Sequence, residues 1–296
     1  MSRGFRSLVM VIVAGVMAGL ASAPARAQQR RVTDLPAHKW EEINWMRLKD
    51  IVPGVTDRAI LPVGTIEAHS VDPNGSDILI PLKLADLSYG PANALIAPPV
   101  YHGPSGQSLM DMAGTIRIRP AIFEEYVYDV LKGLARWQIK NVLVINGHGG
   151  NAEPARRAAQ RVYDEDGLRT MVVEWWNFRR DLSTKIWGGK PHTPGHGALE
   201  ETALNIAYNP KLIERDLYTK IGGKELGSQE GGTGFSVFPG IASMGLPQEP
   251  GEGFPNFDVD KANEYAKQVA AAMAESFVEA IRRWDFIASH QPARQR

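Results

Sequence analysis

Residues 141–151 have the sequence NVLVINGHGGN, and this stretch decides the fold class. Its first five residues form a continuous apolar run, which predicts a strand buried on both faces, as in the middle of a parallel sheet. A turn rich in glycine follows and contains His148. Asn151 then predicts the start of a helix, because asparagine accepts the free N–H groups of a first turn. Strand, turn and helix in this order are typical of an α/β protein.

Similar signals extend on both sides of this stretch. Strands are predicted at residues 58–63, 94–97 and 168–174, and helices at residues 79–87, 151–164, 199–208 and 258–284. A further helix begins at Pro120, with apolar residues at helical spacing from Ile122 through Tyr126 to Leu134. Alternating strands and helices predict an α/β fold with a mainly parallel sheet and helices on both faces. In such sheets, sites gather at the carboxyl ends of the strands.

The N-terminal residues indicate an exported protein. Arg3 and Arg6 precede an apolar run over residues 8–20, and Ala25-Arg26-Ala27 fits the cleavage pattern of a signal peptide. The run is shorter than the ~20 residues that a spanning helix needs, so no stable membrane anchor is expected. We predict a signal peptide at 1–27, an N-terminal lead-in at 28–54 and one domain at 55–296, and we expect the polar residues 28–40 of the lead-in to be loose. The mature protein is expected to be periplasmic or secreted.

Composition excludes several functions. The chain has no cysteine, which excludes disulfides, thiolate metal ligands and a cysteine nucleophile. Lys and Arg together number 33, as do Asp and Glu, and no basic stripe is present. Nucleic acid is therefore not an expected partner.

Residue types that bind metals follow three of the predicted strands. Imidazole and carboxylate groups together suit Zn²⁺, Mn²⁺ or Fe²⁺, and such a set can hold one or two ions. Paired ions serve hydrolysis. The candidates are Glu67, His69 and Asp77 after the first strand, His148 after the third, and His196 with Glu201 after the fourth.

The evidence for a metal site differs between the first two segments. Glu67 and His69 share one face of an extended loop, and the Asn74-Gly75 turn would fold Asp77 back toward them. The alternative is a solvated loop with incidental charges. The turn around His148 lacks the spacing of phosphate-binding loops, so we interpret His148 as a metal ligand. The alternative is a histidine hydrogen-bonded for structure.

In the third segment, the sequence does not show which of two glutamates is the metal ligand. Glu200 and Glu201 point about 100° apart on a helix, so one should face the sheet and the other should be solvated. Spacing alone does not choose between them. Trp175 and Trp176 end a predicted strand and are candidates for the wall of a substrate pocket, although core packing is the usual role of such residues. Ser105 is a candidate substrate contact in a loop.

The motifs LPVGxxExH…GxD, VxNGHGGN and HGxxEET, in this order, resemble the creatininase (creatinine amidohydrolase) family over roughly residues 55–285. The resemblance implies a three-layer α/β/α sandwich. It also implies hydrolysis of C–N bonds in small, often cyclic amides with one or two divalent ions, and assembly into homo-oligomers, often hexamers.

The resemblance also implies roles for individual residues. One ion would be bound by Glu67 and His148, the other by His69, with Asp77 bridging, Glu201 as the remaining ligand and His196 as the acid–base group. Some positions depart from the family. The loop before Asp77 is one residue shorter and lacks a second His. Gly150 replaces a Glu ligand of creatinine hydrolases, and His192 replaces a Trp that covers their substrate. We retain His192 as a candidate substrate contact, but creatinine is not our first choice of substrate.

The sequence therefore predicts an exported metal-dependent amidohydrolase that acts on a small-molecule amide. One alternative is a non-catalytic periplasmic protein that binds a small ligand or a metal in the same cleft. Another alternative retains the chemistry but changes the substrate, as in a peptidase or deformylase of the same family.

Overall fold

The computed structural model describes residues 30–69, 71–106, 109–178, 182–188, 196–214, 217 and 258–290. The predicted signal peptide lies outside the described residues, as do His192 and most of residues 209–257. Within the described part, no helix combines the length and the apolar character needed to cross a membrane.

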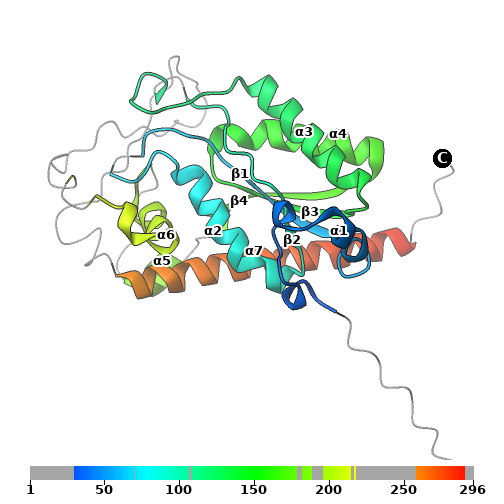
Figure 1. Cartoon of the computed structure of the whole chain (residues 1–296). Coiled ribbons are helices and arrows are strands. Elements are labelled where there is room, and N and C mark those ends of the chain that lie inside the picture. Colours follow the sequence, from blue (N-terminus) through cyan, green and yellow to red (C-terminus); the bar gives the residue numbers. More distant parts are fainter. Residues whose placement is uncertain are drawn as a thin grey trace, which may run out of the picture.

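In the described part of the chain, four parallel strands form the central sheet (Figure 1). They are β1 (Arg58–Val63), β2 (Leu95–Ile96), β3 (Asn141–Asn146) and β4 (Arg169–Glu174), in the spatial order β2-β1-β3-β4. Val63 pairs with Asn146 and Asn146 with Glu174, so β1, β3 and β4 end at the same edge. The predicted strands are confirmed, although β2 is shorter than expected.

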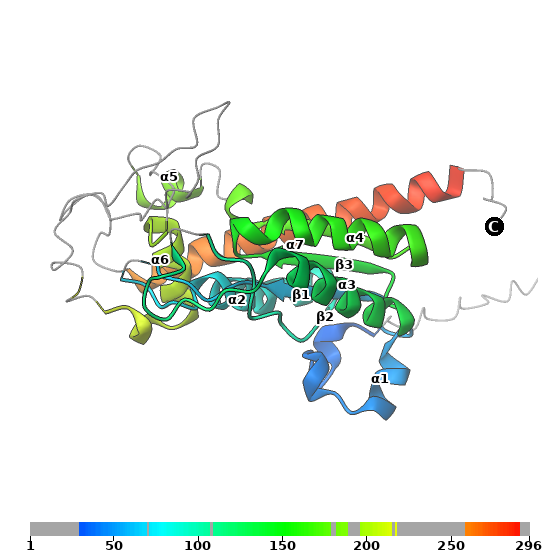
Figure 2. The same ribbon diagram turned by 90° about the horizontal axis from the view of Figure 1, so that it is seen from above.

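Helices cover both faces of this sheet, which confirms the predicted α/β/α sandwich. α3 (Pro120–Arg136) and α4 (Ala152–Asp166) lie on one face, and α2 (Ser76–Ala92) and α7 (Val259–His290) on the other (Figures 1 and 2). α5 (Leu182–Trp187) and α6 (Leu199–Tyr208) pack on α7, and α1 (Trp45–Ile51) lies at the opposite end of the molecule. Short 3₁₀ turns occupy Val32–Asp34, Trp40–Glu42, Gly149–Asn151, Trp175–Phe178 and Pro210–Leu212.

The two faces of the sheet carry separate hydrophobic cores. Successive side chains of a strand point to opposite faces. Accordingly Ile60 and Leu143 pack in the core with α2, α6 and α7, whereas Leu61 and Val144 pack with α3 and α4. All four are fully buried. Continuous apolar strands are thus explained by helices on both sides.

The N-terminal lead-in is packed rather than loose. From residue 30 onward it lies against the domain, and Val32, Leu48 and Ile51 are buried in the α3–α4 core. The Val32 N–H donates to Asn93 Oδ1 at 2.9 Å. The segment is polar overall, so the sequence did not indicate that these apolar residues would be buried.

The apolar residues of α3 lie on two faces of the helix. Ile122 and Tyr126 are 48% and 52% exposed, whereas Phe123, Val127 and Leu131 are buried. The helix carries two apolar rows about 100° apart, and periodicity does not say which row faces the sheet. The outer row remains as an exposed apolar surface.

Candidate metal centre

Three segments far apart in the sequence meet beyond the carboxyl ends of the strands, near α6 (Figure 1). They are the loop of residues 64–77 after β1, the turn after β3 and the first turn of α6. Parallel strands that end at one edge bring the residues after them together. The structure thereby unites the predicted ligands and acid–base group: Glu67, His69, Asp77, His148, His196 and Glu201.

The loop after β1 folds back on itself. The Glu67 N–H donates to the carbonyl oxygen of Asn74 at 2.9 Å, which confirms the turn predicted at Asn74-Gly75. His69 Nδ1 lies 3.0 Å from the carbonyl oxygen of Glu67, so the other ring nitrogen, Nε2, faces the cluster. Asp77 then falls in the first turn of α2, a helix that begins three residues earlier than predicted.

Two glycines set the position of Asp77. A Cβ atom at Gly64 or at Gly147 would collide with the main-chain carbonyl oxygen of Asp77. The Gly147 N–H also donates to the carbonyl oxygen of Val63 at 2.9 Å. Glycine leaves the space that this close backbone approach requires. The start of α2 is thereby wedged between the ends of β1 and β3.

Two asparagines hold the turn that carries His148. The side chain of Asn146 donates to the carbonyl oxygen of His148 at 2.7 Å and accepts from its N–H at 3.1 Å. The sequence predicted that the side chain of Asn151 caps α4. The structure shows no such side-chain hydrogen bond. The side-chain amide of Asn151 donates instead to the carbonyl oxygen of Gly64 at 3.2 Å, because the turn after β3 lies against the start of the other loop.

Two groups of ligand atoms share Asp77. In the first group, His148 Nδ1 lies 3.1 Å from Glu67 Oε1 and 3.0 Å from Asp77 Oδ2. In the second group, His69 Nε2 lies 2.9 Å from Asp77 Oδ1 and 3.9 Å from Glu201 Oε2. Within each group the ligand atoms lie within 4.8 Å of one another. Asp77 turns one oxygen to each group, as a bridging ligand between two ions would.

Glu201, and not Glu200, lies at the cluster. Glu201 Oε2 accepts the N–H of Gly197 at 2.7 Å, which fixes the carboxylate over the first turn of α6. Glu200 is outside both ligand groups but is only 3% exposed. The expectation that one of the two would be solvated is therefore wrong.

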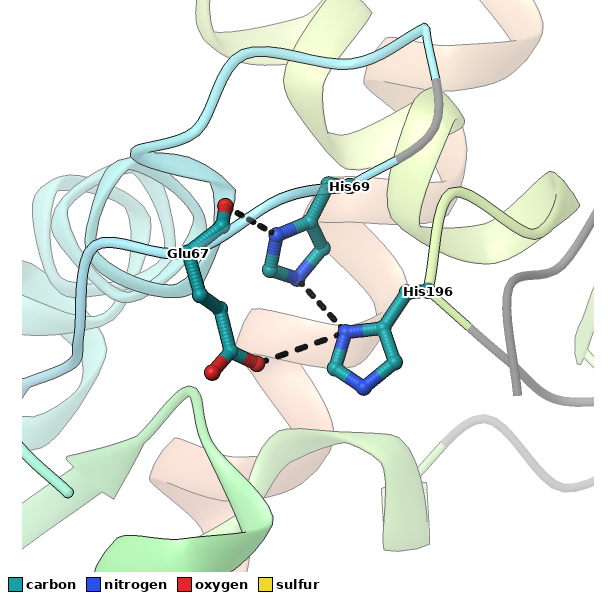
Figure 3. Close-up of side chains that lie close together, drawn as sticks. All are labelled: Glu67, His69 and His196. Carbon is teal, nitrogen blue, oxygen red and sulfur yellow. Dashed lines mark hydrogen bonds and ion pairs between the residues drawn. The ribbon is translucent and has the colours of Figure 1, made fainter. Parts of the chain in front are cut away.

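His196 lies between the two groups (Figure 3). Its Nδ1 is 3.2 Å from His69 Nε2 and 3.5 Å from Glu67 Oε1. The His196 side chain is 25% exposed, whereas those of His69 and His148 are 0% and 9% exposed. His196 is thus the imidazole of the cluster that a molecule from solvent can reach.

The donor atoms fit a divalent ion. Glu67 Oε1 and Asp77 Oδ2 are buried and have no hydrogen-bond partner among the described residues. Both lie close to His148 Nδ1, but one N–H cannot serve two acceptors with good geometry. Buried oxygens without partners are costly, and a cation would satisfy them. Imidazole nitrogens with carboxylate oxygens are the ligands that Zn²⁺, Mn²⁺ and Fe²⁺ accept.

The histidines differ in protonation. Burial alone would lower the pKa of His148, but the adjacent carboxylates of Asp77 and Glu67 raise it to about 9. Burial and the positive charge of His69 lower the pKa of His196 to about 4. At neutral pH, His148 of the metal-free protein is therefore a positively charged imidazolium. His196 is a neutral imidazole and can accept a proton.

The predicted substrate contacts have different outcomes. Ser105 is buried, and its hydroxyl donates to Glu67 Oε2 at 2.6 Å, so it supports a ligand candidate. Trp175 is 1% exposed in the core with α7 and is not available to a substrate. Trp176 is half-buried and packs edge-on against Trp175, with ring centroids 5.8 Å apart. The prediction for His192 falls outside the described residues.

Sequence reasoning missed a buried carboxylate beside the cluster. Asp72 is 5% exposed and accepts hydrogen bonds from Thr202 and Asn205 of α6. In the sequence it precedes Pro73-Asn74-Gly75 and resembles an ordinary solvated turn residue. Its partners lie 130 or more residues away, so no local signal marks it.

Layers of helix, parallel sheet and helix, with buried imidazoles and carboxylates at the carboxyl ends of the strands, define an α/β protein with a candidate two-metal centre. The family model described as creatinine amidohydrolase matches residues 41–281. The chain therefore belongs to the creatininase family, which confirms the resemblance noted in its motifs.

Individual relatives agree with this assignment. The chain is 24% identical over 165 residues to the 3-dehydro-scyllo-inosose hydrolase of Thermotoga maritima, covering 54% of this chain and about half (53%) of that relative. It is 24% identical over 191 residues to the creatinine amidohydrolase of Pseudomonas putida, covering 59% and 73%. A mutant creatininase of Zn–Zn type has the same fold, with a TM-score of 0.71 at 18% identity, covering 83% of this chain and 99% of the other.

Proposed function

We propose that this protein is a metal-dependent amidohydrolase that hydrolyses a C–N bond of a small linear or cyclic amide. The observation that carries the proposal is the position of Asp77, whose two oxygens face two separate groups of ligands. Membership of the creatininase family supports amide hydrolysis. The Zn–Zn form of a structural neighbour supports a centre with two ions.

The chain would hold the ions with buried groups that are already in place. Glu67, His148 and Asp77 would bind one ion, and His69, Asp77 and Glu201 the other. When bound, Zn²⁺, Mn²⁺ or Fe²⁺ supplies a Lewis acid for the amide carbonyl and lowers the pKa of water toward neutrality. Gly64 and Gly147 pack against the backbone of Asp77, and Asn146 is hydrogen-bonded to the backbone of His148. These contacts hold the ligand atoms at fixed separations.

His196 would move the proton. It is neutral at pH 7, because burial and the charge of His69 lower its pKa to about 4, and its Nδ1 faces the cluster. His196 would take a proton from water as the oxygen bonds to the carbonyl carbon, and would give it to the nitrogen as the C–N bond breaks. Its exposure lets it meet a substrate, which the buried ligands cannot do.

Metal content and hydrolysis, measured together, test the proposal. The purified protein is assayed against cyclic amides, linear amides, formylated amines and short peptides, before and after chelation. We expect metal in the purified protein and turnover of at least one amide that the chelator abolishes and metal restores. Failure to bind Zn²⁺, Mn²⁺ or Fe²⁺ after reconstitution would overturn the proposal in favour of a binding protein.

Export is a separate part of the proposal. It rests on the charged, apolar and small-residue segments of residues 1–27, with cleavage near Ala27. N-terminal sequencing of the protein recovered from a bacterial periplasm should begin near Gln28. Recovery of the uncleaved chain in the cytoplasm would contradict export and leave the chemistry unaffected.

We also propose that the protein forms a homo-oligomer, with a hexamer as the expectation from the family. Exposed apolar side chains on α3 and in the segment before it support association. They are Met110, Met112, Ile116, Ile122 and Tyr126, which are 40–52% exposed. Light scattering after size-exclusion chromatography measures the mass directly, and a monomer at micromolar concentration would contradict the proposal.

A further inference from the structure

Asp72 connects the loop after β1 to α6. Its Oδ2 accepts hydrogen bonds from Thr202 Oγ1 at 2.8 Å and from Asn205 Nδ2 at 3.2 Å. Thr202 and Asn205 lie three residues apart on one face of α6. The Asp72 N–H donates to the carbonyl oxygen of His69 at 2.8 Å, so Asp72 is hydrogen-bonded directly to the His69 backbone.

A second contact strengthens this connection. Asn205 Nδ2 also donates to Ser76 Oγ at 3.0 Å, and Ser76 Oγ donates to the carbonyl oxygen of Pro73 at 2.6 Å. Asp72, Ser76, Thr202 and Asn205 are all at most 5% exposed. Buried polar groups that are hydrogen-bonded to one another hold elements in a specific arrangement.

Each end of this network adjoins a ligand candidate of the second group. Ser76 directly precedes Asp77, and Thr202 directly follows Glu201. His69 and Glu201 come from different elements, and their ligand atoms, Nε2 and Oε2, lie 3.9 Å apart. That separation depends on how the loop packs against α6, and the Asp72 hydrogen bonds join these two elements.

The first group is held in another way. Ser105 supports Glu67 and Asn146 supports His148, and neither of these two supporting residues belongs to α6. The backbone of Asp77 is wedged against Gly147. Loss of the link to α6 should therefore leave these positions unchanged.

We propose that Asp72 is a positioning residue for one of the two ions, the ion bound by His69, Asp77 and Glu201. This inference rests on the proposed metal-dependent function. Partners that orient a ligand typically change metal affinity by about 10–100-fold when they are removed. Removal of the Asp72 carboxylate should therefore weaken the second ion by a factor in that range and leave the first ion within about threefold.

Zn²⁺ titration by calorimetry of the full mature chain, with metal content after dialysis, tests the proposal. Asp72→Ala should lose one of the two ions, and Thr202→Val, which removes one hydroxyl and keeps the shape, should weaken the same ion. Asp72→Asn retains an acceptor oxygen for Thr202 and Asn205, so it should restore most of the binding. An Asn variant as weak as the Ala variant would contradict positioning by hydrogen bonds.

Paired variants identify the ion. In a Glu201→Gln background, whose second site is already lost, Asp72→Ala should have no further effect. In a His148→Ala background, Asp72→Ala should remove the remaining ion. Equal weakening of both ions, or unchanged binding of both in Asp72→Ala and Thr202→Val, would overturn the proposal.

A matched control separates positioning from general destabilisation. Thr56 is also buried, and its hydroxyl donates to the carbonyl oxygen of Asn93, away from the cluster. Thr56→Val should lower the melting temperature and leave both ions in place. A wild-type chain that binds no metal would instead contradict the proposed function itself, and the two failures are therefore distinguishable.

Discussion

The main-chain carbonyl oxygen of Asp77 occupies the space that a Cβ atom of Gly147 would need. Gly147 belongs to the turn after β3, and Asp77 to the first turn of α2, 70 residues earlier. The bridging candidate is therefore positioned by backbone packing. This relationship explains why the chain needs glycine directly before His148, and it leads to a test in which two neighbouring glycines behave differently.

Gly147→Ala should abolish or strongly weaken metal binding. The added methyl group must displace the start of α2 or the turn, and forced overpacking typically costs about 1–3 kcal/mol of stability. Zn²⁺ titration and thermal unfolding measure both effects. Gly149→Ala is the matched control, because apart from its two chain neighbours nothing lies within 4 Å of a Cβ built there. Equal metal affinity and equal stability of the two variants would contradict the positioning of Asp77 by Gly147.

Ser105→Ala should weaken the ion held by Glu67 and His148. The hydroxyl donates to Glu67 Oε2 at 2.6 Å, and its loss leaves that carboxylate free to rotate away from the ion. We expect metal affinity to fall by about tenfold or more. Ser88→Ala removes another buried hydroxyl, which donates to the carbonyl oxygen of Ala270, and should leave affinity unchanged. Unchanged affinity in Ser105→Ala would argue against this support.

His196→Gln should retain both ions and lose turnover. Glu67, His69 and His196 form a third set of close ligand atoms, but the two groups that share Asp77 are complete without His196, so metal content should match the wild type. General acid–base groups contribute about 10²–10⁴-fold, and kcat should fall by that factor. His148→Ala should in contrast lose one of the two ions together with activity. Loss of metal in His196→Gln would make His196 a ligand and contradict its role as proton carrier.

Metal affinity should rise with pH. Burial alone would lower the pKa of His148, but Asp77 and Glu67 raise it to about 9, so the metal-free protein holds a proton there at pH 7. A metal ligand must be deprotonated, so binding releases this proton, and affinity should increase up to about pH 9. Chelator competition at several pH values, with heats compared in two buffers, measures the release. Affinity independent of pH would contradict the protonation assigned to His148.

The stability of the metal-free protein, in contrast to the metal affinity, should fall as the pH rises. A histidine whose folded pKa exceeds its ordinary value of about 6.5 stabilises the fold at low pH. For His148 this contribution is complete below about pH 6.5 and is lost as the pH rises through about 9. The melting temperature of the chelated protein should therefore fall across this interval. A melting temperature that rises there would contradict the prediction.

The buried strands and ligand types were predictable because their causes are local. Continuous apolar runs marked β1 and β3, and Asn74-Gly75 marked the turn that returns the loop to Glu67. The start of α2 was missed because Gly75, its N-cap, gives no side-chain capping signal. Whether Glu200 or Glu201 faced the cluster depended on the rotation of α6, which tertiary packing decides.

Long-range partners were not predictable. Asp72 looks like a turn residue until α6 places Thr202 beside it, and Ser105 looks like a loop hydroxyl until the loop brings it to Glu67. Trp175, directly after β4, could have faced a pocket or the core, and packing against α7 places it in the core. In each case the deciding contact comes from an element distant in sequence.

The central claim is that two ions share Asp77, and the number of Zn²⁺ ions per chain tests it most directly. The wild type should bind about two, as paired-metal hydrolases do, and His69→Ala and His148→Ala about one each. Asp77→Ala should bind neither ion tightly. A wild type that binds a single ion, or an Asp77→Ala variant that still binds two, would contradict the account.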